Sequence, residues 1–147
     1  MAVKTIEIFV NKDKEGMVIE KVTHEVEKAI EKSGINDGIA TIFVGCSTAS
    51  LSTMEFNSES VKEMEQALER IAPSNVDYDH HHTVADSEGV GADVNGHSHI
   101  RSTFLGPSVT VPFDNKKLFM EDGIDIVLLD FDLIKRKRKV IIQLIGE

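Results

Sequence analysis

Short apolar runs rich in β-branched residues recur along this chain, and they constrain its fold more than any other feature. Residues 3–10 alternate apolar and polar side chains, which predicts a half-buried strand. Residues 39–44 are nearly all apolar and predict a strand that is covered on both faces. Residues 124–132 and 140–145 predict a C-terminal hairpin whose strands are joined through a basic segment.

The other expected strands are shorter. A turn at 11–16 leads into a returning strand at 17–21, and further strands are expected at 108–111, closed by Pro112, and at 118–120. The total is about seven strands with two or three helices. Successive strands with few helices between them favour an α+β fold, with mixed but mostly antiparallel sheet layers, over a doubly wound α/β fold.

Two amphipathic helices are predicted. The first takes Thr23 as its N-cap and stops at Gly34, and its apolar face is Val26, Ala29 and Ile30. The second is ended by Pro73. Its apolar residues, spaced by three, four and three positions, are Val61, Met64, Leu68 and Ile71.

Composition limits the classes of function. The chain has 147 residues, which suits one domain spanning 1–147, and its net charge of −9 argues against a duplex-binding surface. An aromatic content of 5% without Trp gives little surface for stacking bases. No apolar run approaches the ~20 residues of a membrane span, and the first residues alternate instead of forming a signal-peptide core. With a single cysteine, Cys46, the chain is expected to be soluble and cytoplasmic.

A basic cluster interrupts this acidic chain at residues 135–139, which read Lys-Arg-Lys-Arg-Lys. Such a run is typical of a solvated hairpin turn, and a phosphate-binding patch is the alternative.

Hydroxyl side chains gather after the strand expected at 39–44. Residues 45–50 read Gly-Cys-Ser-Thr-Ala-Ser, and Glu55 follows. Hydroxyl groups and free backbone amides at a strand end can hold a phosphate, with Ser47 and Thr48 as candidates. The alternative is that these are turn and edge residues and that Cys46 is a small buried apolar side chain.

Five of the six histidines lie between residues 75 and 106, in a stretch too poor in apolar residues to predict a regular element before Ile100. Residues 80–82 are all His, and His97 and His99 follow an Asp and an Asn. Imidazole is a common metal ligand, and His with Asp and Cys suits zinc, although a solvated loop is the alternative. His97 and His99 share a face only in extended structure, since on a helix they point apart. Arg101 could meet a phosphate or pair with a local acid.

Several motifs in order resemble the YjbQ family, whose members are also described as secondary thiamine-phosphate synthase enzymes. Residues 46–49 read Cys-Ser-Thr-Ala where the family has His-Thr-Thr-Ala or His-Thr-Ser-Ala, and Leu51 and Glu55 follow as in the family. The family's Tyr-x-His and its Ser/Ala-His-Leu/Ile match residues 78–80 and 98–100. A Leu-Gly-x-Ser-x-x-x-Pro element follows at 105–112, and Gly-Glu closes the chain.

The resemblance implies an α+β fold, commonly assembled as a homotrimer, and weak thiamine-phosphate synthase activity. That transferase reaction joins a pyrimidine pyrophosphate to a thiazole phosphate. The resemblance implies Ser47, Thr48 and Arg101 as the cradle for phosphate oxygens. The implied catalytic residues are His80, His99, Asn95 and Glu55.

The chain departs from the family at three places. Cys46 replaces the motif His, Met54 replaces an Asn, and residues 121–124 (Glu-Asp-Gly-Ile) replace Gly-Thr-Trp-Gln. A thiolate is still a good zinc ligand, but it is a different group for proton transfer.

The resemblance also implies a divalent metal, zinc by its ligand types. Cys46, His80 and His99 stand where the family has His and would leave a fourth position open, with His97 in reserve. Asp93 or Asn95 could orient an imidazole. The alternative function is a non-catalytic metal- or phosphate-binding oligomer. This alternative is favoured by the additional histidines His81, His82 and His97. A further alternative is a decayed site on a partner-binding oligomer.

Overall fold

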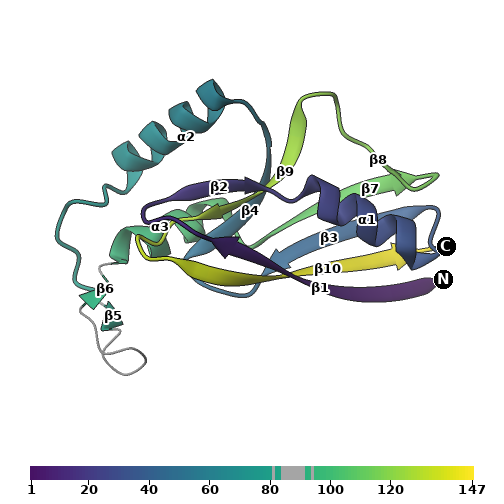
Figure 1. Cartoon of the computed structure of the whole chain (residues 1–147), viewed down its shortest axis with the longest axis horizontal. Helices are drawn as coiled ribbons and strands as arrows, with labels where there is room; N and C mark the ends of the chain where they lie inside the picture. The colour runs from purple at the N-terminus through teal and green to yellow at the C-terminus, as the bar shows by residue number, and fades with distance from the viewer. Residues whose placement is uncertain (81, 84–91, 94) are drawn as a thin grey trace.

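A computed structural model of the chain describes residues 1–80, 82–83, 92–93 and 95–147. It contains two antiparallel sheets with helices packed on and beside them (Figure 1). The α+β class and the antiparallel pairing predicted from the sequence are confirmed.

The larger sheet carries the two ends of the chain. In order across the sheet its strands are β1 (Ala2–Lys12), β10 (Arg136–Gly146), β3 (Gly38–Val44), β7 (Ser108–Asp114) and β8 (Lys117–Leu118). The register aligns Ile6 with Ile142, Ile142 with Ile42 and Ile42 with Val109, so one apolar row crosses four strands. Such cross-strand pairs stabilise a sheet.

The smaller sheet has the order β2 (Val18–Lys21), β9 (Ile124–Asp130) and β4 (Ala49–Glu55). A separate two-residue pairing joins β5 (His82–Thr83) to β6 (Ala92–Asp93). The central strand β9 is apolar nearly throughout and buried from Ile126 onward. Both of its edges are paired and both of its faces are covered: Ile126 and Leu128 lie in the main core, and Val127 and Leu129 lie in a second cluster with Leu68 of the helix at 58–71.

Two expected strand pairings are wrong. The hairpin of 124–132 with 140–145 does not form, because β9 lies in the small sheet and β10 in the large one. The strand at 17–21 likewise pairs with β9 instead of returning along β1. In both places the connection between the two strands is short. The chain nevertheless crosses from one sheet to the other there, because each strand then buries apolar side chains between the two sheets.

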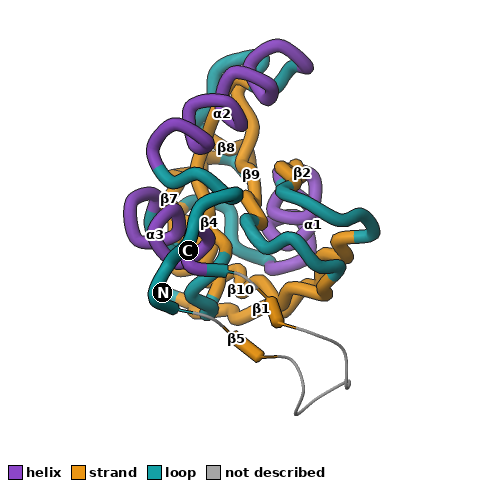
Figure 2. The backbone as a smooth tube through the Cα atoms, turned by 90° about the vertical axis from the view of Figure 1, so that its left-hand side faces the viewer, coloured by secondary structure: helices purple, strands orange, loops and turns teal. Residues whose placement is uncertain are grey.

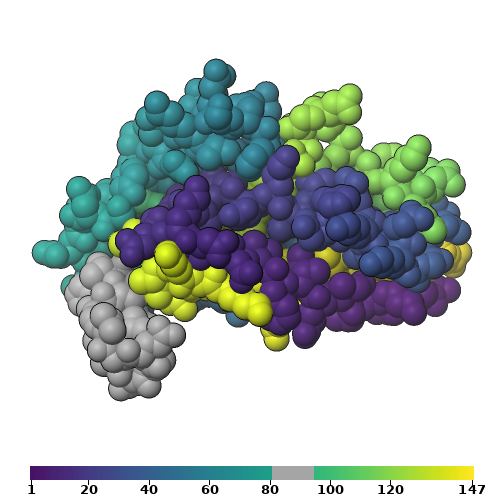
Figure 3. All heavy atoms as spheres, in the orientation of Figure 1, coloured from purple at the N-terminus to yellow at the C-terminus, as the bar shows by residue number. Residues whose placement is uncertain are grey.

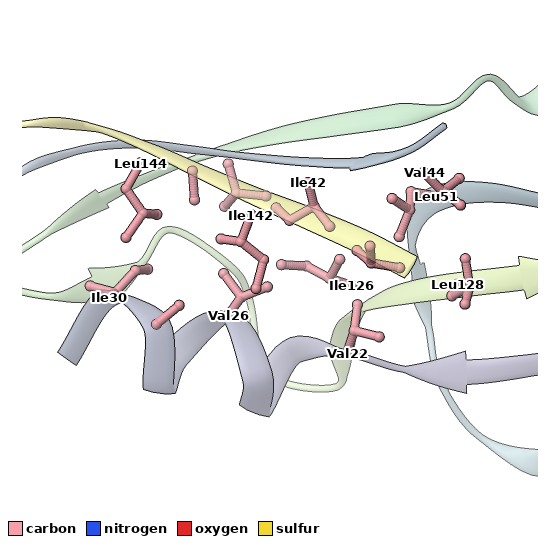
Figure 4. Packing of buried hydrophobic residues seen from close by; sticks show 14 of the residues in the cluster. Val22, Val26, Ile30, Ile42, Val44, Leu51, Ile126, Leu128, Ile142 and Leu144 are labelled. Atoms are coloured by element: carbon pink, nitrogen blue, oxygen red, sulfur yellow. The ribbon is translucent and has the colours of Figure 1, made fainter. Parts of the chain in front are cut away.

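Helix α1 (Thr23–Ser33) packs on the core with Val26, Ala29 and Ile30, as predicted. Figure 4 shows its labelled residues facing those of β9 and β10. The helix stops at Gly34, whose φ of 79° is the left-handed conformation that glycine favours. Thr23 is not the N-cap, since Val22 holds that position. The Thr23 hydroxyl instead accepts from the Ile126 amide at 2.9 Å, joining α1 to β9.

Strand β3 is covered on one face only, contrary to the prediction. Ala40, Ile42 and Val44 are buried in the core, but Ile39 is 40% and Phe43 is 42% exposed. The apolar residues of this strand therefore face two different surfaces: one set points into the core, and the other lies on the outer face of the large sheet.

Helix α2 (Ser58–Ile71) extends beyond the sheets, as Figure 2 shows, and contacts the small sheet through Leu68, which packs with Val127 and Leu129 of β9. Asn57 caps it by accepting from the Ser60 amide at 2.8 Å, and it ends before Pro73 as predicted. Of its apolar face only Leu68 is buried, whereas Ile71 is 56% exposed.

Helix α3 (Gly96–Leu105) lies where the sequence predicted no regular element before Ile100. Its first turn is polar but buried, so hydrophobic periodicity could not reveal it. None of the helices in the described part of the chain has both the length and the apolarity needed to cross a membrane.

Candidate functional site

Three polar segments meet at one end of the two sheets. The turn at 45–48 connects β3 to β4, and the segment at 131–135 connects β9 to β10. Val44 pairs with Val140 and Ala49 pairs with Asp130, so the turn lies beside the end of β9 and the beginning of β10. The first turn of α3 lies against the segment at 131–135, through a contact of His97 with Phe131.

Arg138 is the centre of a buried charge network at this place. Its Nε and Nη2 donate to both carboxylate oxygens of Asp130 at 2.7 and 2.9 Å. Its Nη2 also donates to Asp132 at 3.0 Å and to the Thr48 hydroxyl at 2.8 Å. Burial alone would lower the pKa of Arg138, but the hydrogen bonds and charge of Asp130 outweigh it and raise the pKa. The guanidinium is therefore a permanent cation beneath the turn at 45–48.

Two further cations surround Asp132. Arg136 Nε lies 2.6 Å from its carboxylate, and Lys12 donates to its backbone carbonyl and to that of Ile134 at 2.7 Å. Burial lowers the pKa of Lys12, and the charges of Asp130 and Asp132 only partly offset this effect. Three cations and two carboxylates thus meet in this network.

The basic cluster is not the solvated hairpin turn expected from the sequence. β10 begins inside it, so its side chains alternate between two environments. Arg138 points inward and Arg136 is partly buried, while Lys135, Lys137 and Lys139 are exposed. In Figure 3 the C-terminal segment, in yellow, reaches the surface beside the N-terminal strands in purple.

His97 and His99 point apart, as expected if a helix carries them. His97 is fully buried, and its Nε2 lies 3.0 Å from the Phe131 carbonyl. Burial lowers the pKa of His97, the nearby Arg101 charge lowers it further, and the bond to Phe131 partly opposes both. His99 is partly exposed, and its ring meets the His80 ring edge-on with centroids 4.6 Å apart. The structure therefore joins His80 with His99 and keeps His97 separate.

Arg101 is expected from the sequence to bind a phosphate or to pair with an acid. In the structure it connects α3 to the end of α2. It is 1% exposed and donates from Nε and Nη2 to the Ala72 carbonyl at 3.0 and 2.8 Å. Its Nη2 also pairs with Glu69 at 2.8 Å. This arrangement matches the alternative in which Arg101 pairs with a local acid.

The remaining predicted residues are dispersed. Thr48 is in the Arg138 network, Ser47 is exposed in the same turn, and Cys46 is partly buried close enough to interact electrostatically with Arg138. Glu55 is exposed at the other end of β4, roughly 20 Å along the strand from its first residue. Asn95 is buried before α3.

The zinc ligands expected from the resemblance are not brought together. Within the residues that the structure describes, no three His, Cys, Asp or Glu side chains are placed to hold a metal ion. Cys46, His80 and His99 are all described, so this donor set does not fit the expected centre. His81 lies outside the described residues, as do the side chains of His82 and Asp93.

Sequence reasoning did not single out Asp130 and Asp132, and it placed Arg136 and Arg138 only within the basic cluster, where a phosphate patch was the alternative; these four residues form most of the site. Two signals could have revealed them: acids that end an apolar strand, and arginines spaced by two within the basic cluster. A spacing of two in a strand puts both arginines on one face.

A cavity of about 630 Å³ lies elsewhere, between α1 and residues 116–125. Glu121, Asp122 and Gly123 line it, and they belong to the segment that replaces Gly-Thr-Trp-Gln. The cavity has the volume of a small-molecule site, but carboxylates outnumber lysines in its lining, so its net charge is negative and does not favour a phosphate.

Fold and site define a class: an antiparallel α+β protein with a buried arginine–carboxylate network between its two sheets. Comparison with known proteins makes this more specific. The chain matches the family described as UPF0047 protein YjbQ-like over residues 5–147, and it belongs to that family.

Relatives carry the same description. A UPF0047 protein of Methanothermobacter thermautotrophicus is 29% identical over 126 residues, covering 86% of this chain and 81% of that protein. A UPF0047 protein of Mycobacterium tuberculosis is 31% identical over 105 residues, covering 71% of this chain and 73% of that protein.

Solved structures agree with the fold. A YbjQ-like protein of unknown function from Sulfolobus solfataricus superposes with a TM-score of 0.85 at 25% identity, covering 99% of each chain. An uncharacterised YjbQ/UPF0047 protein from Clostridium acetobutylicum gives 0.81 at 26% identity, covering 95% of this chain and 99% of that one.

Proposed function

We propose that this chain binds a small phosphorylated molecule where the turn at 45–48 meets the beginning of β10. The observation that carries the proposal is the buried network around Arg138. Buried charges are expensive to desolvate, and well-packed apolar residues often stabilise a fold equally well. A network of this kind is therefore better explained by a ligand than by stability.

Charge and hydroxyl groups support an anionic ligand. The network contains the cations Arg138, Arg136 and Lys12, and the exposed Lys135, Lys137 and Lys139 add positive potential in an otherwise acidic chain. The Thr48 hydroxyl accepts from Arg138, so its own proton can be donated to a phosphate oxygen. Ser47 offers a second hydroxyl at the surface.

Binding is tested with inorganic phosphate and a thermal melt. We expect phosphate to raise the melting temperature of the unmodified protein, since a ligand stabilises the folded state by mass action. Thr48→Val removes the hydroxyl and should weaken this effect several-fold. Thr53→Val, on the exposed end of β4, is the matched control and should respond like the unmodified protein. An equal response of all three proteins would contradict the proposal.

The reaction we propose for the site is weak thiamine-phosphate synthesis. The thiazole nitrogen forms a bond to the methylene carbon of the pyrimidine, and the bond from that carbon to the pyrophosphate oxygen breaks, so pyrophosphate leaves with the electron pair. Charge on the leaving pyrophosphate needs fixed cations, and Arg136 and Arg138 are the cations of this site. An assay with both substrates, with and without divalent metal, should give product above the uncatalysed background. No product under either condition would exclude the reaction.

Binding without turnover is the second candidate. It is favoured by Cys46, which stands where the family has His and differs from an imidazole in pKa and hydrogen-bond geometry for proton transfer. In that case phosphate stabilises the protein, but the assay yields no product. Elemental analysis of protein purified without a His-affinity step tests whether metal accompanies binding.

A further inference from the structure

Three buried hydrogen-bond acceptors near the site have no donor. They are Asn95 Oδ1, His97 Nδ1 and Asp132 Oδ1, and none has a partner in the part of the chain that the structure describes. Asn95 is 3% exposed, and His97 and Asp132 are fully buried. An unmet buried acceptor costs about 1–3 kcal/mol, so three of them in one region need an explanation.

The bond to Phe131 determines which nitrogen of His97 is the acceptor. A carbonyl oxygen can only accept, so the hydrogen in the 3.0 Å contact belongs to Nε2. Burial favours the uncharged ring. Nδ1 is then left with a bare lone pair and requires a donor.

Asp132 presents its free oxygen in the same region. Its Oδ2 accepts a hydrogen bond from Arg138 Nη2 and forms an ion pair with Arg136, which leaves Oδ1 without a donor among the described residues. Phe131, whose carbonyl holds the His97 ring, is the preceding residue, and the Asp132 charge acts on that ring. Arg136, which covers Oδ2, is 31% exposed, so the carboxylate lies only one side chain below the surface.

We propose that the phosphorylated ligand of this site also carries an amino group, whose N–H bonds are received by His97 Nδ1 and Asp132 Oδ1. This inference rests on the proposed anion site, because the phosphate brings the amine to these acceptors. The ligand is then a phosphorylated amine, with its anion toward the turn at 45–48 and its donor toward α3.

Calorimetric titration with three small probes tests the amine separately from the phosphate. We expect 2-aminoethyl phosphate to bind about tenfold tighter than ethyl phosphate, which corresponds to one or two added charge-assisted hydrogen bonds. 2-Hydroxyethyl phosphate should fall between them. If ethyl and aminoethyl phosphate bind equally, the amine proposal is overturned while the anion site stands. If no phosphate binds, both fail.

Asp132→Asn tests the acceptor directly, because the amide nitrogen can replace Oδ1 while the amide oxygen still receives the arginines. We expect this variant to lose the preference for aminoethyl over ethyl phosphate. Asp122→Asn, exposed in the distant cavity, is the control and should keep the preference. An unchanged preference in Asp132→Asn would overturn the proposal.

A spectroscopic test uses the unmodified protein and therefore does not depend on whether a variant folds. A long-range ¹⁵N–¹H spectrum should show the His97 ring protonated at Nε2 only, with the Nδ1 signal shifting on addition of aminoethyl phosphate but not of ethyl phosphate. A proton on Nδ1 in the free protein, or an Nδ1 signal unmoved by the bound amine, would overturn the inference.

Discussion

Arg138 shows how a single side chain can be read in two ways. In the sequence it is one of five cationic residues in a row, but in the structure it is 7% exposed and satisfied by Asp130, Asp132 and Thr48. The neighbouring Lys137 and Lys139 are exposed. The difference follows from strand geometry, which sends alternate residues to opposite faces.

Removing the Arg138 charge should strongly destabilise the fold. Arg138→Met leaves two carboxylates buried without their main partner, and we expect the free energy of unfolding to fall by about 3–5 kcal/mol. Urea denaturation measures the change. Lys135→Met removes an exposed charge from the same cluster and should change the free energy by less than about 0.5 kcal/mol. Similar losses in both variants would contradict the buried network.

At the scale of elements, α2 and α3 are held together by few contacts. α2 buries only Leu68, and the link between the helices is the Glu69–Arg101 pair, which also involves the Ala72 carbonyl. The hydrophobic pattern of α2 correctly predicted a helix. It did not predict that most of the apolar face of this helix stays at least partly exposed. Periodicity indicates that a face is apolar, whereas the covering surface comes from segments distant in sequence.

The Glu69 link should make stability depend on pH in the acid range. Burial alone raises the pKa of Glu69, but hydrogen bonds from Ser74 and Arg101 outweigh it and lower the pKa from 4.5 to about 2. Because the folded pKa lies below the unfolded value, the carboxylate stabilises the fold above about pH 4.5. That contribution is lost as the pH falls toward about 2.

Glu69→Gln should remove this pH dependence. Since the side chain is 47% exposed, solvent screening limits the loss at pH 7 to about 1 kcal/mol. Urea denaturation between pH 2 and 7 measures it, with the exposed Glu59→Gln as the control. Parallel pH curves for Glu69→Gln and the unmodified protein would show that the link does not stabilise the carboxylate.

At the scale of the whole molecule, the outer face of the large sheet bears on the oligomer implied by the family resemblance. Val3 on β1 and Ile39 and Phe43 on β3 are 58%, 40% and 42% exposed, and β10 lies between these two strands in the sheet. A polar row crosses the same face, and it is internally bonded: Thr5 with Gln143 at 2.6 Å, and Thr41 with Thr110 at 2.9 Å. Polar groups that are already paired can be buried at little cost.

We expect two or more copies of the chain, a trimer by the resemblance, to associate through this face. At micromolar concentration the protein should sediment as an oligomer, and Phe43→Glu should shift it toward the monomer by burying a charge in the contact. Ile71→Glu, on α2, also replaces an exposed apolar side chain (56% exposed) but lies outside the large sheet, and it should leave the assembly unchanged. A monomeric unmodified protein would contradict the expectation.

Local order was predictable from the sequence because it depends on neighbours in the chain. The alternation of β1, the apolar face of α1 and its stop at Gly34, the end of α2 before Pro73, and the α+β class all follow from residues a few positions apart. The motif order that resembles the YjbQ family also lies in the sequence alone, and membership of that family is confirmed.

Tertiary structure alone decided which strands pair and which polar residues meet. β9 and β10 follow each other in sequence but belong to different sheets, because each buries its apolar face against a different partner. The same separation turns the segment between them inward and brings Asp130, Asp132 and Arg138 beneath Thr48, which Arg138 follows by 90 residues in the chain. Long-range burial, which no local pattern encodes, therefore created the candidate site, and it left the expected ligands Cys46, His80 and His99 without a common centre.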